Sequence, residues 1–251
     1  MPPPLDRVLI PVFPEKIRGG FNSVWNSELI ISNYSQQDVI LASGNPYCRV
    51  SAGCGDEFIR VAPGVEIRPG GMDDQDKSGI FGQLWVVEKA HADQVNFLLR
   101  VWDESRQLDH WGVSIPVVRE NEFLSGPVEL NGAPTADAFR VTLRVYEPDP
   151  TNVAAVRVLI SGFHVNEQRA GTEEFEVILG LTGGTDPTID PLWPSSPAVG
   201  QISDIVGKFP DLSLAERLKV RVEPLDPDLR YWAFLTVTHN ETQNITVIAP
   251  D

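Results

Sequence analysis

The feature that most constrains this chain is a series of short runs in which apolar and polar residues alternate. The clearest is Phe139–Tyr146 (FRVTLRVY), where apolar side chains are separated by arginine or threonine. A period of two residues is typical of a β-strand with one buried face. Turns rich in Pro and Gly separate these runs, and only Asp211–Leu218 (DLSLAERL) has helical spacing. The sequence therefore predicts an all-β protein of roughly thirteen to fifteen strands, with at most one or two short helices.

Two segments at opposite ends of the chain share a pattern. In Trp25–Leu41 and in Trp232–Ile248, a Trp precedes an Asn, which is followed by a hydroxyl residue and a Gln at matching spacing. We predict that each segment is a hairpin whose Asn turn sets the register, because Asn can bond its own backbone in a turn. The paired Trp residues would anchor two related cores. A chance likeness between two ordinary hairpins is the alternative.

A second start of the strand pattern near Ser125–Pro127 indicates two units. We predict two tandem immunoglobulin-like β-sandwich domains, 1–126 and 127–251; a single large jelly roll is the alternative. In the first unit an Ile-Pro-Val triplet occurs in Arg7–Phe13 and again in Ile115–Val117. Because Pro cannot donate a ladder hydrogen bond, these two strands are expected at sheet edges or bulges.

Charge and cysteine content limit the partners and the compartment. The net charge of −15 argues against nucleic acid and against an anionic membrane surface. No apolar run approaches the roughly 18 to 20 residues that span a bilayer. Cys48 and Cys54 close a short loop (CRVSAGC), which favours a local disulfide in an exported protein; two free thiols are the alternative. The Pro-rich start has no export signal, so export implies a signal that was removed.

The first half resembles a group of uncharacterised exported proteins known mainly from Acidobacteria. The residues that carry the likeness are LIPVF, the Gly-rich loop and FNSVWNSELIISNYSQQDVIL, with matching pieces in FRVTLRVYEPD and the closing RYWAFLTVTHNETQNITVIAP. In those proteins an IPV-type opening strand leads to a Trp-containing strand that ends in an Asn turn. The resemblance implies export and β-sandwich architecture, and it implies no activity. It extends more broadly to immunoglobulin-like surface modules of bacteria.

The sequence contains no motif for catalysis. None of the four His has zinc-protease spacing, no nucleophile elbow is present, and no Gly-rich loop has the Lys and helix of a phosphate site. We therefore expect a protein that is not an enzyme and needs no cofactor. Two acidic clusters have the oxygen ligands that Ca²⁺ prefers, although solvated loops are the alternative. Their members are Asp73, Asp74 and Asp76 in the first cluster, and Asp186 and Asp190 in the second.

The expected function is that of an exported structural or interaction protein at or outside the cell surface. Its partners would be other protein chains, including copies of itself, and its N-terminal strand could be donated to a neighbour's sheet. The donated segment would be Arg7, Val8, Leu9 and Ile10. The alternative is a carbohydrate-binding module that uses Trp111 and Trp193, which lie beside turns; a core-capping role is the other reading of these two. The remaining Trp residues lie in predicted strands and are expected in the core.

Overall fold

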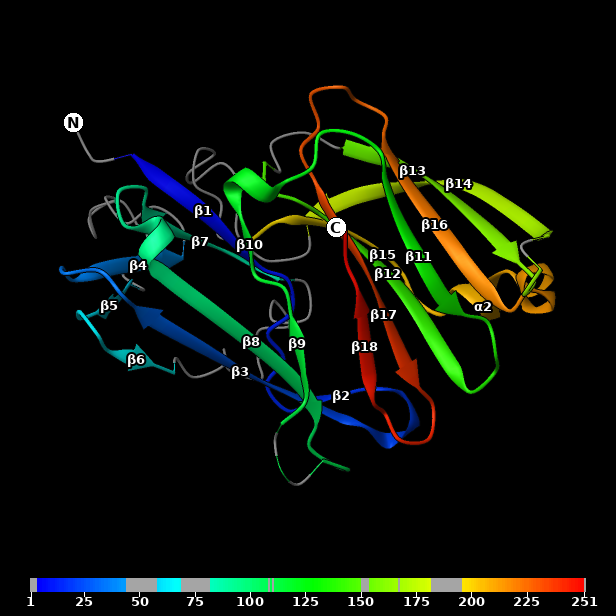
Figure 1. The fold of residues 1–251 in the computed structure, drawn as a ribbon, viewed down its shortest axis with the longest axis horizontal. Coiled ribbons are helices and arrows are strands. Elements are labelled where there is room, and N and C mark those ends of the chain that lie inside the picture. Colours follow the sequence, from blue (N-terminus) through cyan, green and yellow to red (C-terminus); the bar gives the residue numbers. More distant parts are fainter. Residues whose placement is uncertain are drawn as a thin grey trace.

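The structure is a computed structural model that describes residues 4–43, 58–68, 82–107, 109, 111–149, 154–166, 168–181 and 196–250. Most of these residues form antiparallel strands, so the all-β prediction is confirmed. Strands of the first half lie on one side of the molecule and those of the second half on the other (Figure 1). Within the described residues, no helix is long and apolar enough to cross a membrane.

The first half forms two sheets. One has the order β10-β1-β7-β4-β5. Its strands are β1 (Leu5–Ile10), β4 (Val39–Ser43), β5 (Phe58–Val61), β7 (Gln83–Glu88) and β10 (Val118–Arg119). The other has the order β2-β3-β8-β9, with β6 paired to β3. Its strands are β2 (Ile17–Arg18), β3 (Val24–Asn33), β6 (Glu66–Ile67), β8 (Val95–Asp103) and β9 (Val113–Ile115).

The second half is one hydrogen-bonded path of eight strands, in the order β11-β16-β13-β14-β15-β12-β17-β18. The long β14 pairs with β13 along most of its length and with β15 at its end, so the path turns back around its own core. The strands are β11 (Val128–Pro134), β12 (Phe139–Glu147), β13 (Ala154–Phe163), β14 (Arg169–Leu181), β15 (Ala198–Ile202), β16 (Arg217–Pro224), β17 (Trp232–His239) and β18 (Ile245–Ile248).

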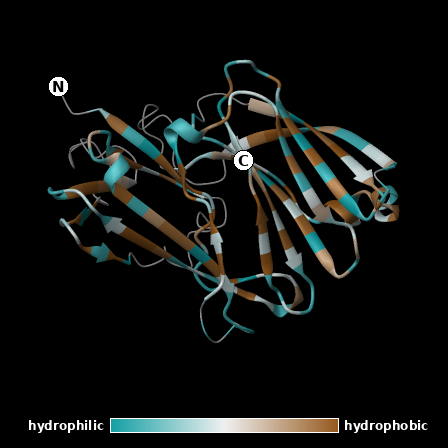
Figure 2. Ribbon diagram, viewed as in Figure 1, coloured by the Kyte–Doolittle hydropathy of each residue, from teal (hydrophilic) through white to brown (hydrophobic). Residues whose placement is uncertain are grey.

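Strand β12 lies between the two cores of the molecule, because its two faces pack against different halves. Val141, Leu143 and Val145 are fully buried in the core of the second half. The opposite face turns to the first half, and its last member, Tyr146, belongs to the first half's core. Figure 2 shows the alternation of hydrophilic and hydrophobic residues along these strands. The two halves therefore share one continuous apolar contact.

The predicted edge position of the first strand is wrong. Strand β1 pairs with β7 over its whole length and with β10 at Val8 and Leu9. The residues from Val8 to Ile10 are fully buried, as expected of a continuous apolar run that is covered on both faces. Pro11 and Pro116 each follow the last residue of a strand, Ile10 or Ile115. At both triplets the chain passes from one sheet of the first half to the other, so the Pro residues mark crossings between sheets.

The two Asn-turn segments differ in the structure. Strands β17 and β18 form the predicted hairpin, with Leu235 opposite Ile248. Strands β3 and β4 do not pair, because they belong to different sheets. Asn33 is buried and donates from its amide to the carbonyls of Gln37 and Val61, which turns the chain between the sheets instead of folding it back.

Local sequence signals are incomplete at three further places. The runs Gly82–Glu88 and Asn96–Asp103 are close together in the sequence, but they do not form a hairpin, because β7 and β8 lie in different sheets. The helical spacing of Asp211–Leu218 gives only a 3₁₀ turn at Pro210–Leu214, because β16 begins at Arg217; the α-helix α2 (Ile205–Lys208) lies just before it. Strand β15 is a short apolar run with little alternation, so a period of two does not predict it.

Candidate functional site

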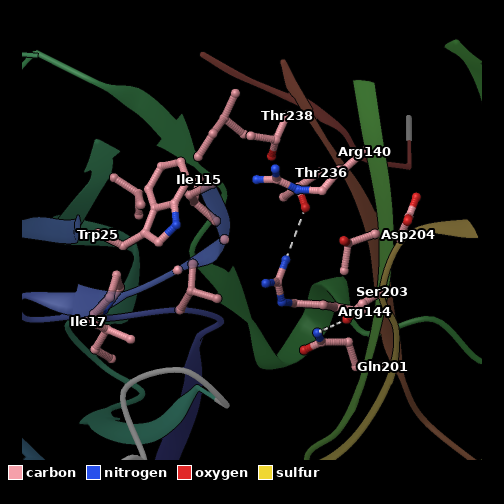
Figure 3. A pocket seen from close by; sticks show the side chains of 17 residues that line it. Ile17, Trp25, Ile115, Arg140, Arg144, Gln201, Ser203, Asp204, Thr236 and Thr238 are labelled. Atoms are coloured by element: carbon pink, nitrogen blue, oxygen red, sulfur yellow. Dashed lines mark hydrogen bonds between the residues drawn. The ribbon is translucent and has the colours of Figure 1, made fainter. Parts of the chain in front are cut away.

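A cavity of about 320 Å³ lies where the two halves meet, and we call it the junction cleft. The first half contributes residues from β2, β3, β8 and β9, and the second half contributes residues from β12, β15, β17 and β18. Figure 3 shows the two walls facing each other, with Trp25 on one side and Arg144 on the other. Its volume is that of a cleft for a small organic ligand.

The wall from the first half is apolar. Its main side chains are Ile17, Trp25, Val101 and Ile115. Val101 and Ile115 are buried, whereas Ile17 and Trp25 are half-buried and face the cavity (Figure 3). Gly19 has to lack a side chain here, because an added Cβ would collide with the indole Nε1 of Trp25. This wall therefore offers a fixed apolar surface to a ligand.

The wall from the second half is polar and cationic. Arg140, Thr142 and Arg144 alternate with core residues on β12, so the period of two places all three on the face toward the cleft. Thr236 pairs with Thr142 on the neighbouring β17 and lines the same face. Asp204 lies at the start of α2 and is the one carboxylate among the described lining residues.

Among the described residues, the two arginines of the cleft form hydrogen bonds with neutral groups only. Arg144 donates from Nη1 to Thr236 Oγ1 at 3.1 Å, and its buried Nε finds no acceptor among the described residues. Arg140 donates to Asn240 Oδ1 at 3.0 Å and to Gln243 Oε1 at 2.9 Å. In the described part of the chain, neither guanidinium has a carboxylate within ion-pair distance. Burial lowers the pKa of Arg140, opposed by Asp204 and reinforced by the nearby Arg106.

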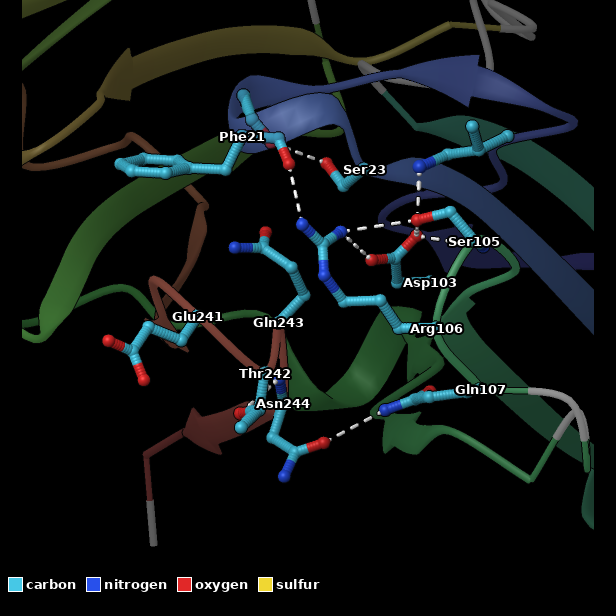
Figure 4. A network of polar contacts seen from close by, with 12 residues as sticks. Phe21, Ser23, Asp103, Ser105, Arg106, Gln107, Glu241, Thr242, Gln243 and Asn244 are labelled. Carbon is cyan, nitrogen blue, oxygen red and sulfur yellow. Dashed lines mark hydrogen bonds and ion pairs between the residues drawn. The ribbon is translucent and has the colours of Figure 1, made fainter.

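A strained loop holds an aromatic ring over Arg140. Phe21 and Asn22 have positive φ values of 57° and 59°, a region that non-glycine residues occupy at a cost. The ring of Phe21 lies 4.6 Å from the Arg140 guanidinium carbon, a cation–π contact. Arg106 donates to the Phe21 carbonyl at 2.6 Å and to Asp103 at 2.6 Å, which ties the loop to the end of β8 (Figure 4).

Asp103 is the fixed point of this network. Its side chain is fully buried and accepts hydrogen bonds from the backbone of Val24 and Ser105, from the Ser105 hydroxyl and from Arg106. Burial alone would raise the pKa of Asp103, but these bonds together lower it. Asp103 therefore remains a carboxylate that fixes Arg106, and through it the Phe21 loop.

A second pair of arginines at the junction has ionic partners. Arg7 bonds to Glu120 and Asp149, and Arg230 bonds to the same two carboxylates; we call these four residues the Arg7 ring. Arg7 also donates to the carbonyl of Pro148 at 3.0 Å. Burial opposes the charge of Arg7, but the bonds to Glu120 and Asp149 outweigh it and raise the pKa of Arg7. The ring links β1 to segments of the second half.

Of the site residues predicted from the sequence, the structure describes Trp111 and residues 7–10. Trp111 is 65 % exposed, and the Arg100 guanidinium lies 4.1 Å from its ring centroid. Trp111 is therefore a surface residue and does not cap the core. Residues Arg7–Ile10 form the internal strand β1 and not a free edge. The remaining predicted residues lie outside the described part of the chain: Cys48, Cys54, Asp73, Asp74, Asp76, Asp186, Asp190 and Trp193. In the described part, no three His, Cys, Asp or Glu residues cluster as metal ligands would.

The sequence pattern alone does not indicate the junction cleft. It assigns Arg140 and Arg144 to the polar face of the clearest strand, and such a face is ordinarily exposed to water. One feature of the sequence points to the cleft. At the end of the strand, the aromatic residue Tyr146 takes the place of a polar residue on the face of Arg140 and Arg144. An aromatic residue in line with two arginines indicates that another part of the molecule covers that face.

Comparison with known proteins gives no relative for this chain, since no family model, curated protein or solved structure matches it.

Proposed function

We propose that this protein is a non-enzymatic, exported structural or interaction module made of two immunoglobulin-like sandwiches, 1–126 and 127–251. The observation that carries the proposal is the junction between the halves. Tyr146 from β12 is fully buried in the first half's core and donates to the Pro11 carbonyl at 2.6 Å. Phe234 stacks on Tyr146 with ring centroids 6.1 Å apart. The resemblance to exported Acidobacteria-type proteins supports the same proposal.

A fixed junction suits a structural or interaction role. The aromatic contact and the Arg7 ring act at different places on the same junction, and together they oppose hinge motion between the halves. Surfaces on the two halves then keep one relative orientation, which a subunit or spacer needs in order to transmit position or force. The exposed face of β11, β16 and β13 carries ion pairs such as Lys219 with Glu129, which keep that face soluble.

Self-association is the specific form that we propose for this module. The eight-stranded path ends on β11, whose outer edge is unpaired among the described residues and is a template for another strand. Sedimentation velocity over a wide concentration range tests this form, and we expect the mean mass to rise with concentration. A monomer at every concentration would contradict it.

Strand donation from the N-terminus is tested separately. Release of β1 would expose Val8, Leu9 and Ile10 and would remove Arg7 from its ring. A synthetic peptide of residues 5–13 should compete for the acceptor groove and reduce assembly, whereas a scrambled peptide should not. If assembly occurs and the peptide leaves it unchanged, the association uses strand edges without donation.

Glycan binding is the second candidate, and the exposure of Trp111 favours it. A ring that is 65 % exposed can stack on a sugar, and Arg100 on the ring could bond its hydroxyls. A glycan array with Trp111→Ala and Trp193→Ala tests this candidate. Binding that disappears in either variant supports it, and an array without signal for the unmodified protein removes it.

A further inference from the structure

We propose that the junction cleft binds a small organic carboxylate, whose anionic end is held by Arg144 and Arg140 and whose apolar body lies against Trp25. The proposal goes beyond the structural role above and does not depend on it. It rests on four features of the cleft: unused cationic donors, the direction in which Arg144 points, the contrast between an apolar and a polar wall, and a loop that positions Arg140.

The first feature is unused donor capacity in a chain of strong negative charge. A guanidinium has five N–H donors, yet Arg144 uses one of them on Thr236 and leaves its buried Nε without an acceptor among the described residues. An unpaired buried donor is costly, and a carboxylate is the acceptor that matches the planar guanidinium fork. The chain carries 35 acidic residues, but those in the described part do not neutralise this pair.

The second feature is the direction in which Arg144 points. Thr236 lies opposite Thr142 in the ladder, one step along the face toward Arg140. Because Arg144 bonds to Thr236, its guanidinium leans along the strand toward Arg140 and does not extend away from it (Figure 3). Thr236 lies between the two arginines in Figure 3, and its hydroxyl, which accepts from Arg144, still has its own hydrogen to donate to the same anion. The N–H and O–H donors of Arg140, Arg144 and Thr236 therefore lie around one position in the cleft, where an anion can bind.

The third feature is the contrast between the walls. Ile17, Ile115 and the ring carbons of Trp25 face the donors across a cavity of about 320 Å³ and offer no hydrogen-bond partner to a polar ligand body; the indole N–H is the one polar group of these three side chains. An acid with an aliphatic or aromatic body satisfies both walls, whereas a sugar acid leaves its hydroxyls against the apolar one. Asp204 at the polar wall adds a negative charge, which disfavours ligands with two or more charges, such as phosphate.

Phe21 and Arg106 act as positioning residues. The strained Phe21 loop lies over Arg140, and the chain of bonds from Asp103 through Arg106 to the Phe21 carbonyl holds it there (Figure 4). Backbone strain that the surrounding structure maintains is often found at ligand sites. The cation–π contact with Phe21 and the hydrogen bonds to Asn240 and Gln243 together fix the guanidinium of Arg140 before a ligand binds.

Isothermal titration with hydrocinnamate tests the proposal, with its neutral amide as the matched ligand. We expect hydrocinnamate to bind with one site per chain and the amide to bind about 10- to 100-fold more weakly, since it cannot form charge-assisted hydrogen bonds. Equal affinity for acid and amide would overturn the role of the arginines. Absence of hydrocinnamate binding at millimolar concentration would overturn the site.

Variants locate the binding in the cleft. Arg144→Gln and Arg140→Gln should each weaken hydrocinnamate binding about tenfold or more, whereas Arg157→Gln, on the exposed face of β13, should leave it unchanged. Gly19→Ala should weaken hydrocinnamate more than acetate, because the new methyl group displaces Trp25. Thermal melting shows whether each variant is folded. Wild-type affinity in folded Arg144→Gln, or tighter binding of glucuronate than of hydrocinnamate, would contradict the proposal.

Discussion

Arg7 and Arg144 lie at the same junction between the two halves, yet they have opposite surroundings. Arg7 contacts two carboxylates and a backbone carbonyl, whereas Arg144 contacts one hydroxyl among the described residues. The pKa of Arg7 is raised by its partners, and that of Arg140, the neighbour of Arg144 in the cleft, is lowered by burial. The difference separates two uses of one residue type: a neutralised arginine stabilises the junction, and an arginine without an anion retains the capacity to bind one.

The largest effect is expected when the Arg7 ring is opened. Arg7→Met leaves Glu120 and Asp149 with Arg230 as their remaining arginine and the Pro148 carbonyl without its donor, while the methionine still fills the space of the stem. We expect a loss of about 2 to 4 kcal/mol in the free energy of unfolding, below the value for a fully buried pair because Asp149 is 45 % exposed. Urea denaturation measures this loss. A change as small as that of a surface pair would show that the ring is not structural.

Glu147 and Asp149 lie two residues apart, and their pKa values are shifted in opposite directions, so the effect of a paired and of an unpaired carboxyl on stability can be compared by varying the pH. Asp149 bonds to Arg7 and Arg230, and its pKa is lowered although burial opposes this. Glu147 is buried with an unpartnered Oε2, and burial, reinforced by Asp149 and Asp226, raises its pKa from 4.5 to about 7. The folded state therefore binds the Glu147 proton more tightly than the unfolded state does. Its contribution to stability is complete below about pH 4.5 and is lost as the pH rises through about 7.

Glu147→Gln should remove this pH dependence. The glutamine resembles the protonated side chain at every pH, so the variant should match the wild type near pH 4.5 and exceed it above pH 7. The expected gain above pH 7 is about 1 to 3 kcal/mol in the free energy of unfolding. Thermal or urea unfolding across this range measures it. Parallel pH profiles of the two proteins would contradict the assignment.

A smaller change in the free energy of unfolding is expected when an arginine of the cleft, Arg144, is replaced by methionine. Arg144→Met loses one hydrogen bond to Thr236 and also removes a buried donor without a partner. These changes oppose each other, so the free energy of unfolding should change by about 1 kcal/mol or less. Urea denaturation of Arg144→Met and Arg7→Met side by side compares the two losses in the free energy of unfolding directly. A loss as large as that of Arg7→Met would mean that Arg144 is a structural residue.

The smallest effect is expected on the exposed face. Arg157 pairs with Glu174 at 3.5 Å, and both side chains are about half exposed, at 47 % and 59 %. Arg157→Met should change the free energy of unfolding by about 0.5 kcal/mol or less, because water screens such pairs. Together, the three methionine variants rank arginines by their partners. A loss for Arg157→Met as large as that for Arg7→Met would break the comparison.

Local pattern predicted the strands but not always their partners. The alternating run Phe139–Tyr146 lies in β12, as its pattern indicated. The Asn turns of the two Trp segments gave the same local signal, yet only β17 and β18 pair with each other. Both Asn side chains donate to a distant carbonyl, and the two turns differ in where that carbonyl lies. Asn33 bonds to Val61 of β5, in the sheet of β4, whereas Asn240 bonds to Asp137, just before β12 in the sheet of β17. A turn motif does not contain that information.

The candidate site was hidden for a related reason. Alternation on β12 indicated correctly that Val141, Leu143 and Val145 face one core, and it assigned Arg140 and Arg144 to the other face. Tyr146 on that face indicates that it is covered, but the pattern cannot show which part of the chain covers it or that a cleft forms there. The cleft arises from this long-range packing, so it could be found only after the two halves were placed together.

The most direct test of the account is a crystal structure of the protein soaked with para-iodohydrocinnamate. We predict one anomalous iodine peak in the junction cleft, with the ring against Trp25 and the carboxylate between Arg144 and Arg140. Iodine at the protein surface alone, with the cleft free of the ligand, would contradict the claim that these two arginines are kept for an anion.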